Sequence, residues 1–164
     1  MYNFKIKSYL KLIFTISFIS IISAYFIEYI LGHQPCNLCL IERIPYGLSI
    51  ILISAHFVIK KNVKFFLILL ILIFIFSFLI SVYHFGIEQG FFQESSICKL
   101  NNTLEIISKE ELLKQLNERT ISCKDVTFKI FGLSLTTINV FISLIILATL
   151  TKTFISYEKI KSKS

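Results

Sequence analysis

Apolar residues in this chain gather into four long runs and do not alternate with polar residues. The runs cover about residues 12–31, 39–59, 65–85 and 130–150. Each run approaches the roughly 20 residues that a helix needs to cross about 30 Å of hydrocarbon. The pattern therefore predicts an all-α membrane protein, a bundle of four transmembrane helices that occupies residues 1–164 as a single membrane domain.

Composition supports the same class of protein. Hydrophobic residues make up 55% of the 164 residues, and the mean hydropathy is +0.76, both above the values typical of soluble domains. Residues 1–24 also have the basic start and apolar middle of a cleaved signal peptide. However, the apolar run continues past Ala24, and Ile22 with Ala24 makes a poor cleavage site, so we favour a retained first helix.

Basic residues cluster in three segments that flank the apolar runs. The amino terminus, residues 60–64 and the tail hold ten of the 17 Lys and Arg residues but a single acid, Glu158. Because short basic flanks remain cytoplasmic, both termini are predicted to be cytoplasmic, with loops at about 32–38 and 86–129 outside. The net charge of +7 is thus divided among membrane flanks, and no nucleic-acid partner is expected.

All four cysteines fall in the two outer loops, on the oxidising side where disulfides persist. Cys36 and Cys39 form a CxxC within GHQPCNLCLIER, while Cys98 and Cys123 lie far apart in the second loop. Four cysteines permit three pairings. A zinc site would need four converging ligands, usually two closely spaced pairs, so no metal is predicted. Two structural disulfides remain an alternative, but the CxxC spacing favours redox chemistry.

The residues around the CxxC indicate a reactive thiol near the outer membrane boundary. We expect the second helix to start early, with Pro35 at its first position and a kink at Pro45. Arg43 then lies about 26 Å above Lys60, just inside the outer edge of the hydrocarbon. Cys39 is four residues before Arg43 and shares its helix face. The cation and the helix amino terminus should both favour a thiolate.

Other polar residues of the apolar runs have simpler interpretations. Glu28 lies roughly 24 Å along the first run, and snorkelling to lipid headgroups is the simplest explanation for it. His84, at the end of the third run, is interpreted as an interfacial anchor. Asn139 is expected to hydrogen-bond another helix. Residues 104–116 are expected to form a short amphipathic helix.

Electrons released by thiol exchange need an acceptor. The chain has five glycines and no glycine-rich dinucleotide motif. An acceptor dissolved in the bilayer is therefore favoured, because Cys39 and Arg43 lie at a depth that a quinone headgroup can reach.

Several motifs together resemble the bacterial DsbB family of disulfide bond formation proteins. They are PCNLCLIERIPYG, YHFGIEQG, the two cysteines of the second outer loop, and SCKDVTFKIFGLSLTTIN. The resemblance covers most of the chain and implies a four-helix bundle in the bacterial inner membrane with two periplasmic loops. It also implies an oxidoreductase that reoxidises a periplasmic DsbA-type thiol oxidase and passes the electrons to ubiquinone or menaquinone.

The same resemblance implies a role for each cysteine. Cys98 corresponds to the sulfur attacked by reduced DsbA, and its partner Cys123 passes the oxidation state to Cys36. Cys39 would be the thiolate that engages the quinone, with Arg43 polarising it. The resemblance adds three candidate quinone contacts: Glu42, His84 and Glu88.

Two other functions stay open at this point. A non-enzymatic membrane scaffold with structural disulfides would have the same cysteine count. A quinone reductase of the vitamin K epoxide reductase type shares the bundle and the CxxC chemistry, but there the CxxC lies late in the chain. We therefore favour the thiol:quinone oxidoreductase.

Overall fold

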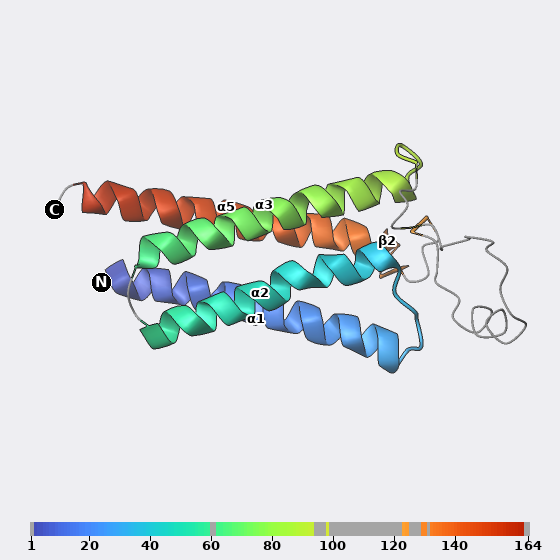
Figure 1. The fold of residues 1–164 in the computed structure, drawn as a ribbon, viewed down its shortest axis with the longest axis horizontal. Coiled ribbons are helices and arrows are strands. Elements are labelled where there is room, and N and C mark those ends of the chain that lie inside the picture. The colour runs from blue at the N-terminus through green and yellow to red at the C-terminus, as the bar shows by residue number, and fades with distance from the viewer. Residues whose placement is uncertain are drawn as a thin grey trace, which may run out of the picture.

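The computed structural model describes residues 2–59, 62–93, 98, 123–124, 129–130 and 132–162. The described chain has four long helices and one short hairpin (Figure 1). The helices are α1 (Tyr2–Tyr29), α2 (Asn37–Ile59), α3 (Val63–Glu88) and α5 (Leu135–Lys161), and the antiparallel strands are β1 (Lys129–Ile130) and β2 (Leu133–Ser134). Both termini lie at one end of the bundle, and the α1–α2 connection and the hairpin lie at the other, here called the cysteine end (Figure 1).

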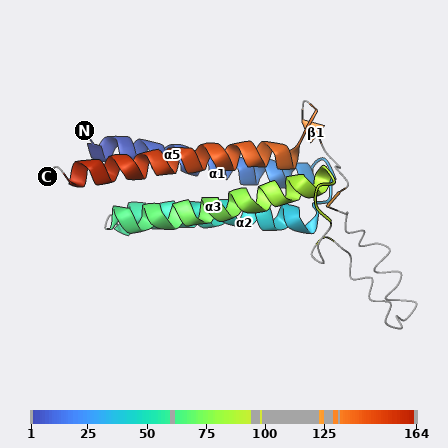
Figure 2. The same cartoon turned by 90° about the horizontal axis from the view of Figure 1, so that it is seen from above.

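The helices form two layers. One layer contains α1 and α5, and the other contains α2 and α3 (Figure 2). The most extensive packing joins α3 to α5, followed by α2 with α3 and α1 with α2. All four helices are long and apolar enough to cross a membrane, so the four apolar runs of the sequence correspond to four candidate spans.

The core of the bundle is built where apolar side chains from all four helices meet. Small polar residues allow close helix approach beside this core: Ser17 and Ser49 are both fully buried, and their hydroxyl oxygens lie 2.9 Å apart between α1 and α2. Small residues at helix contacts are typical of membrane bundles. The buried apolar core comprises Ile6, Leu10, Ile13, Tyr46, Ile53, Leu67, Leu70, Phe74, Ile146 and Leu150.

The helix bounds differ from the expected runs at both ends of the bundle. At the end with the two termini the helices extend further than expected, because α1 begins at Tyr2 and α5 continues to Lys161. At the cysteine end the main difference lies before α5. The prediction of helix for residues 130 and 132–134 is wrong, because Ile130 belongs to β1, Leu133 and Ser134 belong to β2, and Gly132 has a φ of +81°. Ser134 then caps α5, accepting a hydrogen bond from the Thr137 amide at 3.2 Å. The amphipathic helix expected at 104–116 lies outside the described residues.

The α2 helix also begins later than expected. The helix begins at Asn37, so Pro35 precedes the helix and does not occupy its first position, while Pro45 lies inside it. The first helical bond of this region runs from the Leu40 amide to the Cys36 carbonyl at 3.2 Å. Cys36 therefore sits immediately before the helix, and Cys39 lies in its first turn.

Candidate redox site

The four cysteines form two disulfides at the cysteine end. Cys36 is bonded to Cys39, with 5.1 Å between their Cα atoms. Cys98 is bonded to Cys123, with 5.5 Å between their Cα atoms. Both separations are ordinary for disulfides. Of the three pairings that the sequence left open, the structure has the one that keeps the CxxC pair together.

The two disulfides belong to one buried cluster. Cys36, Cys98 and Cys123 are each at most 5% exposed and pack with Leu38 and Ile87. This arrangement brings the CxxC of α2 together with cysteines that follow α3 in the chain. Sulfur atoms from both pairs therefore lie in one region from which water is largely excluded.

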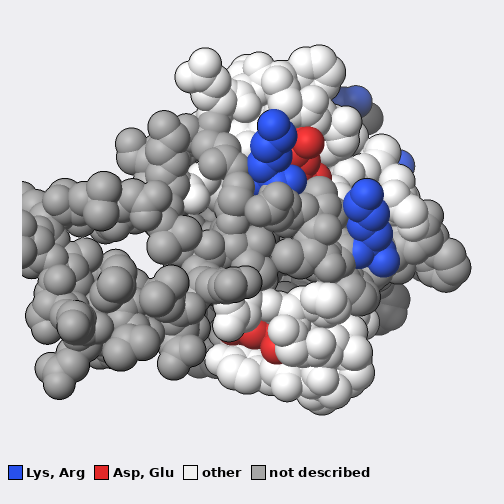
Figure 3. All heavy atoms as spheres, turned by 90° about the vertical axis from the view of Figure 1, so that its right-hand side faces the viewer, with Lys and Arg blue, Asp and Glu red and all other residues white. Residues whose placement is uncertain are grey.

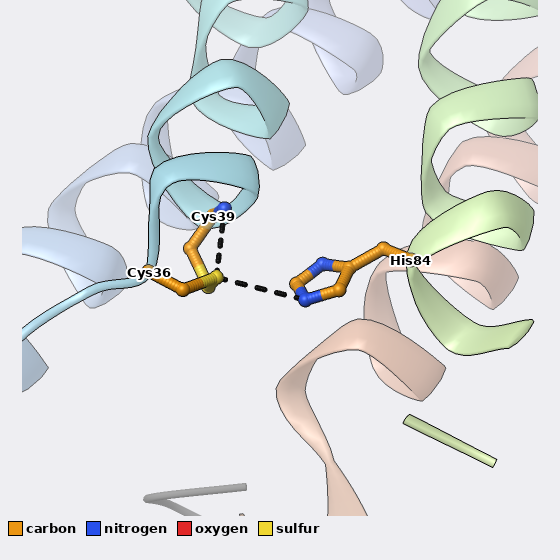
Figure 4. A group of neighbouring side chains, drawn as sticks. All are labelled: Cys36, Cys39 and His84. Carbon is orange, nitrogen blue, oxygen red and sulfur yellow. Dashed lines mark hydrogen bonds between the residues drawn. A yellow bond between two sulfur atoms is a disulfide. The ribbon is translucent and has the colours of Figure 1, made fainter. Parts of the chain in front are cut away.

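His84 on α3 points at the CxxC disulfide (Figure 4). Its Nε2 atom lies 3.6 Å from the Cys36 sulfur. The Cys39 amide donates to the same sulfur at 3.1 Å. A helix-terminal amide and an imidazole thus converge on Cys36, the environment that stabilises a thiolate. The sequence had indicated Cys39 as the stabilised thiolate. In the structure, these polar groups contact the Cys36 sulfur, so they would also stabilise a thiolate at Cys36.

Glu42 holds the imidazole of His84 at Nδ1, the ring nitrogen farther from the Cys36 sulfur. The Nδ1 atom of His84 lies 3.0 Å from Glu42 Oε1, at hydrogen-bonding distance. His84 is 1% exposed. The ring therefore connects the α2 acid to the CxxC sulfur, which contradicts the interpretation of His84 as an interfacial anchor.

Glu42 is held by a second residue that the sequence did not assign to the site. Asn139 on α5 donates to Glu42 Oε2 at 3.0 Å and to Ser81 Oγ at 2.8 Å. Asn139 also accepts a 2.5 Å hydrogen bond from the Tyr46 hydroxyl. The expectation that Asn139 bonds another helix is confirmed. This one side chain joins α2, α3 and α5 directly behind the redox pair.

Glu88 lies one turn beyond His84 and contacts the start of α5. Its carboxylate accepts hydrogen bonds from Ser134 and Thr136, both at 2.6 Å. Thr136 Oγ1 also lies 3.4 Å from His84 Nδ1. Glu88 thus fixes the hairpin and the α5 terminus against α3, and it reaches the same polar network.

Arg43 has a partner that the sequence interpretation missed. Its Nη1 atom lies 2.5 Å from Glu28 Oε2 on α1, and its guanidinium lies 5.2 Å from the centre of the Tyr25 ring. The snorkelling interpretation of Glu28 is therefore wrong, because its carboxylate is occupied within the bundle. The estimated depths of Glu28 and Arg43, about 24 Å and 26 Å at 1.5 Å per residue, were the clue that could have suggested the pair.

These groups surround one cavity of about 330 Å³. Apolar residues of α1 and α5, such as Ile27 and Ile142, form part of its wall. A mostly apolar wall with a few convergent polar groups is typical of small-molecule sites, whose volumes are about 300–1,000 Å³. The cavity lining includes seven of the eight residues singled out from the sequence: Cys36, Cys39, Glu42, Arg43, His84, Glu88 and Cys123.

Figure 3 looks onto the cysteine end, where basic side chains stand out and the visible acidic atoms lie in recesses beside other side chains. Of the acids of the site, Glu42 is 8% exposed, and its carboxylate oxygens contact His84 and Asn139 within the bundle.

A bundle of helices long and apolar enough to cross a membrane, with two adjacent disulfides beside a cavity, fits a membrane protein of thiol–disulfide chemistry. Residues 7–152 match the family described as "Disulfide bond formation protein DsbB", and the chain belongs to this family, which implies disulfide oxidoreductase activity. It is also similar to a protein of Rickettsia prowazekii (strain Madrid E) described as "Uncharacterized protein RP370". The two are 33% identical over 135 residues, which cover 81% of this chain and 78% of that relative.

Proposed function

We propose that this protein is a thiol:quinone oxidoreductase of the bacterial inner membrane. It reoxidises a periplasmic DsbA-type thiol oxidase and passes the electrons to ubiquinone or menaquinone, so that disulfide bonds can form in other proteins. One observation carries the proposal: Cys36, Cys39 and Cys123 line the same cavity, beside Arg43. Disulfide exchange and electron release can therefore take place at neighbouring positions.

The exchange begins at the second cysteine pair. A thiolate of the reduced partner attacks Cys98, the Cys98–Cys123 bond breaks, and the second partner thiol completes the partner's disulfide. The Cys123 thiolate then attacks Cys36, and the Cys36–Cys39 bond breaks. Resolution by Cys98 restores the outer disulfide and leaves Cys36 and Cys39 reduced. Two electrons and two protons have then moved from the partner to the CxxC pair.

The cavity suits a quinone headgroup. Its volume lies within the range of small-molecule sites. Apolar residues of α1 and α5 form part of its wall, and its charged residues Glu42, Arg43 and Glu88 come from α2 and α3. A bound quinone would take up two electrons and two protons and leave as the quinol. Cys39, half-buried in the first turn of α2, supplies the electrons from the membrane side of the pair.

The polar residues of the cavity have distinct roles in this proposal. Arg43 orients a carbonyl oxygen of the headgroup with the guanidinium donors that Glu28 leaves available. His84, held by Glu42, stabilises the Cys36 thiolate and can hold a proton at Nε2. Glu88 positions the start of α5, which forms part of the cavity wall.

A membrane orientation follows from the charge pattern. The basic flanks remain cytoplasmic, so both termini lie inside and the cysteine end faces the periplasm. In chains whose four native cysteines are replaced by serine, a membrane-impermeant maleimide added to intact spheroplasts should label Gln89→Cys, an exposed position at the cysteine end. It should not label Ser162→Cys, whose new thiol lies at the opposite end of the bundle. Labelling of the Ser162→Cys thiol alone would overturn this orientation.

The activity can be tested with purified protein in liposomes that contain quinone. A reduced DsbA-type protein should become oxidised while the quinone absorbance falls in equal amount. Cys36→Ser and Cys39→Ser should each abolish turnover. Formation of the Cys98–Cys123 disulfide in both variants is the folding control. Normal turnover without either cysteine would contradict the proposal.

A further inference from the structure

Three potential metal ligands converge at the CxxC pair. The sulfur atoms of Cys36 and Cys39 and a ring nitrogen of His84 all lie within 4.8 Å of one another. Figure 4 shows the imidazole of α3 pointing at the sulfurs at the start of α2. The sequence predicted no metal because it considered the cysteines alone. The histidine is 48 residues from Cys36 along the chain, and the fold brings it to them.

We propose that the reduced form of this protein binds a soft, thiophilic cation such as Zn²⁺ or Cd²⁺ through Cys36, Cys39 and His84. This proposal goes beyond the proposed function, because it requires only that the CxxC disulfide can be reduced.

The geometry fits tetrahedral coordination. Zinc–sulfur bonds of about 2.3 Å and zinc–nitrogen bonds of about 2.0 Å, at a tetrahedral angle, place sulfur and nitrogen roughly 3.5 Å apart. The observed separation between Cys36 Sγ and His84 Nε2 is 3.6 Å. Two cysteines at CxxC spacing are also a common chelating unit for zinc. Reduction breaks the bond between the two sulfur atoms and lets them move apart. No other change in the positions of the ligand atoms is required for the cation to bind.

The surroundings of the histidine support the same role. A metal-binding histidine usually donates its second ring N–H to a carboxylate, which fixes the tautomer. Here His84 Nδ1 lies 3.0 Å from Glu42, and Asn139 donates to the other oxygen of that carboxylate. The ring is thus held with Nε2 toward the sulfurs before any cation arrives.

Charge and access also favour a soft divalent ion. Two thiolates neutralise a divalent cation, so binding leaves no net charge in a region where Cys36 and His84 are 5% and 1% exposed. Sulfur and imidazole ligands select Zn²⁺ or Cd²⁺ over Mg²⁺ and Ca²⁺. The adjacent cavity gives an entry path and space for water at a fourth position.

Binding depends on the redox state of the pair. A dithiol or a phosphine first reduces the Cys36–Cys39 bond with two electrons, and two protons complete the thiols. The cation then displaces both thiol protons and any proton on His84 Nε2. In the disulfide form neither sulfur is available as a thiolate. If the proposed function holds, a bound cation also withholds both sulfurs from reoxidation and arrests the reduced protein.

The test uses the full chain with Cys98→Ser and Cys123→Ser, so that only the CxxC pair can supply thiolates. The purified protein is reduced with a phosphine under anaerobic conditions, freed of reductant and titrated with Cd²⁺. The sulfur-to-cadmium charge-transfer absorbance should saturate at one Cd²⁺ per chain and should be absent when the CxxC disulfide is intact. No saturable binding to the reduced protein would overturn the proposal.

The role of the histidine is tested with three variants in this background. His84→Gln should weaken Cd²⁺ binding by about tenfold or more, and Glu42→Gln by about tenfold. His56→Gln should leave the affinity unchanged, because His56 lies near the other end of α2. Reformation of the CxxC disulfide on oxidation verifies that each variant is folded. Equal affinity of His84→Gln and the parent would refute the three-ligand site.

A nuclear magnetic resonance measurement gives an independent result. The chain has three histidines, so ¹⁵N-histidine labelling yields signals from three rings. The His84→Gln and His56→Gln variants assign these signals. Cd²⁺ should shift the His84 Nε2 resonance and leave His56 unchanged; an unmoved His84 resonance at saturation would overturn the assignment. These measurements need neither quinone nor a protein substrate, so their failure is distinguishable from failure of the proposed function.

Discussion

Arg43 and Glu28 form an ion pair that joins α2 to α1 at the wall of the cavity, with 2.5 Å between Nη1 and Oε2. Both side chains are mostly shielded, at 17% and 20% exposure, and the guanidinium also lies over the Tyr25 ring. One carboxylate cannot occupy all five guanidinium N–H groups. Arg43 is therefore fixed in position while donors remain available toward the cavity.

Arg43→Ala should weaken the use of quinone. A hydrogen bond to a charged group contributes about 1.5–3 kcal/mol, and each 1.4 kcal/mol corresponds to a factor of ten. We expect the apparent KM for quinone to rise roughly tenfold or more, while disulfide exchange between the two cysteine pairs continues. Steady-state assays over a range of quinone concentrations measure the first effect, and single-turnover thiol trapping without quinone measures the second.

Two further variants sharpen the Arg43 experiment. Arg43→Lys keeps the charge but loses the planar arrangement of donors, so it should recover only part of the quinone affinity. Lys64→Ala is the matched control, because Lys64 pairs with Glu158 at 2.8 Å on an exposed surface, where an ion pair contributes little. An unchanged KM in Arg43→Ala would refute the role assigned to this residue.

The hydrophobic pattern was sufficient to predict four helices, because spanning hydrocarbon requires long apolar runs. It did not give the helix ends, since a helix continues beyond the hydrocarbon wherever its polar residues can reach water or each other. The hairpin before α5 was missed for a related reason. The residues around Gly132 are apolar enough to extend the run, but the glycine adopts a φ of +81° that turns the chain.

The sequence identified the CxxC pair and Arg43 because their chemistry is local, within one stretch of eight residues. The contacts behind them are not local. Asn139 is 97 residues from Glu42, and His84 is 42 residues from it. Which faces of α2, α3 and α5 meet depends on the rotation of each packed helix, and nearly uniform apolar runs contain little information about that rotation.

Asn139→Ala should destabilise the bundle. The change removes three interhelical hydrogen bonds, to Glu42, Ser81 and Tyr46. An average interhelical hydrogen bond in a membrane is worth about 0.6 kcal/mol, so the free energy of unfolding should fall by roughly 2 kcal/mol. Reversible unfolding in mixed micelles measures the change. Ile145→Ala, on the exposed face of the same helix, is the control, and an equal loss in both variants would contradict the prediction.

Phe74→Ala should create a cavity in the core. Phe74 is fully buried and makes an edge-on contact with Tyr46, with 5.8 Å between ring centres. We expect a loss of about 3 kcal/mol, the lower end of the range for this substitution, because the unfolded reference in lipid already shields the ring from water. Phe76→Ala is the matched control on the same helix, where the ring is 55% exposed. The same unfolding assay should show little change for Phe76→Ala, and equal effects would refute the packing argument.

The redox state of the cysteines in living cells separates the proposed enzyme from a scaffold with inert disulfides. Cys36 and Cys39 can remain oxidised only while an acceptor removes the electrons delivered by exchange, so depletion of quinone should leave them reduced. Acid quenching followed by a mass-tagged maleimide counts the thiols in each chain. We expect mostly oxidised cysteines in cells with quinone and an accumulation of reduced thiols after quinone synthesis is blocked, reversed when a soluble quinone is added.

Arg43→Ala should show part of this accumulation even with normal quinone supply, whereas Lys64→Ala should not. Fully oxidised cysteines under all of these conditions would favour the scaffold.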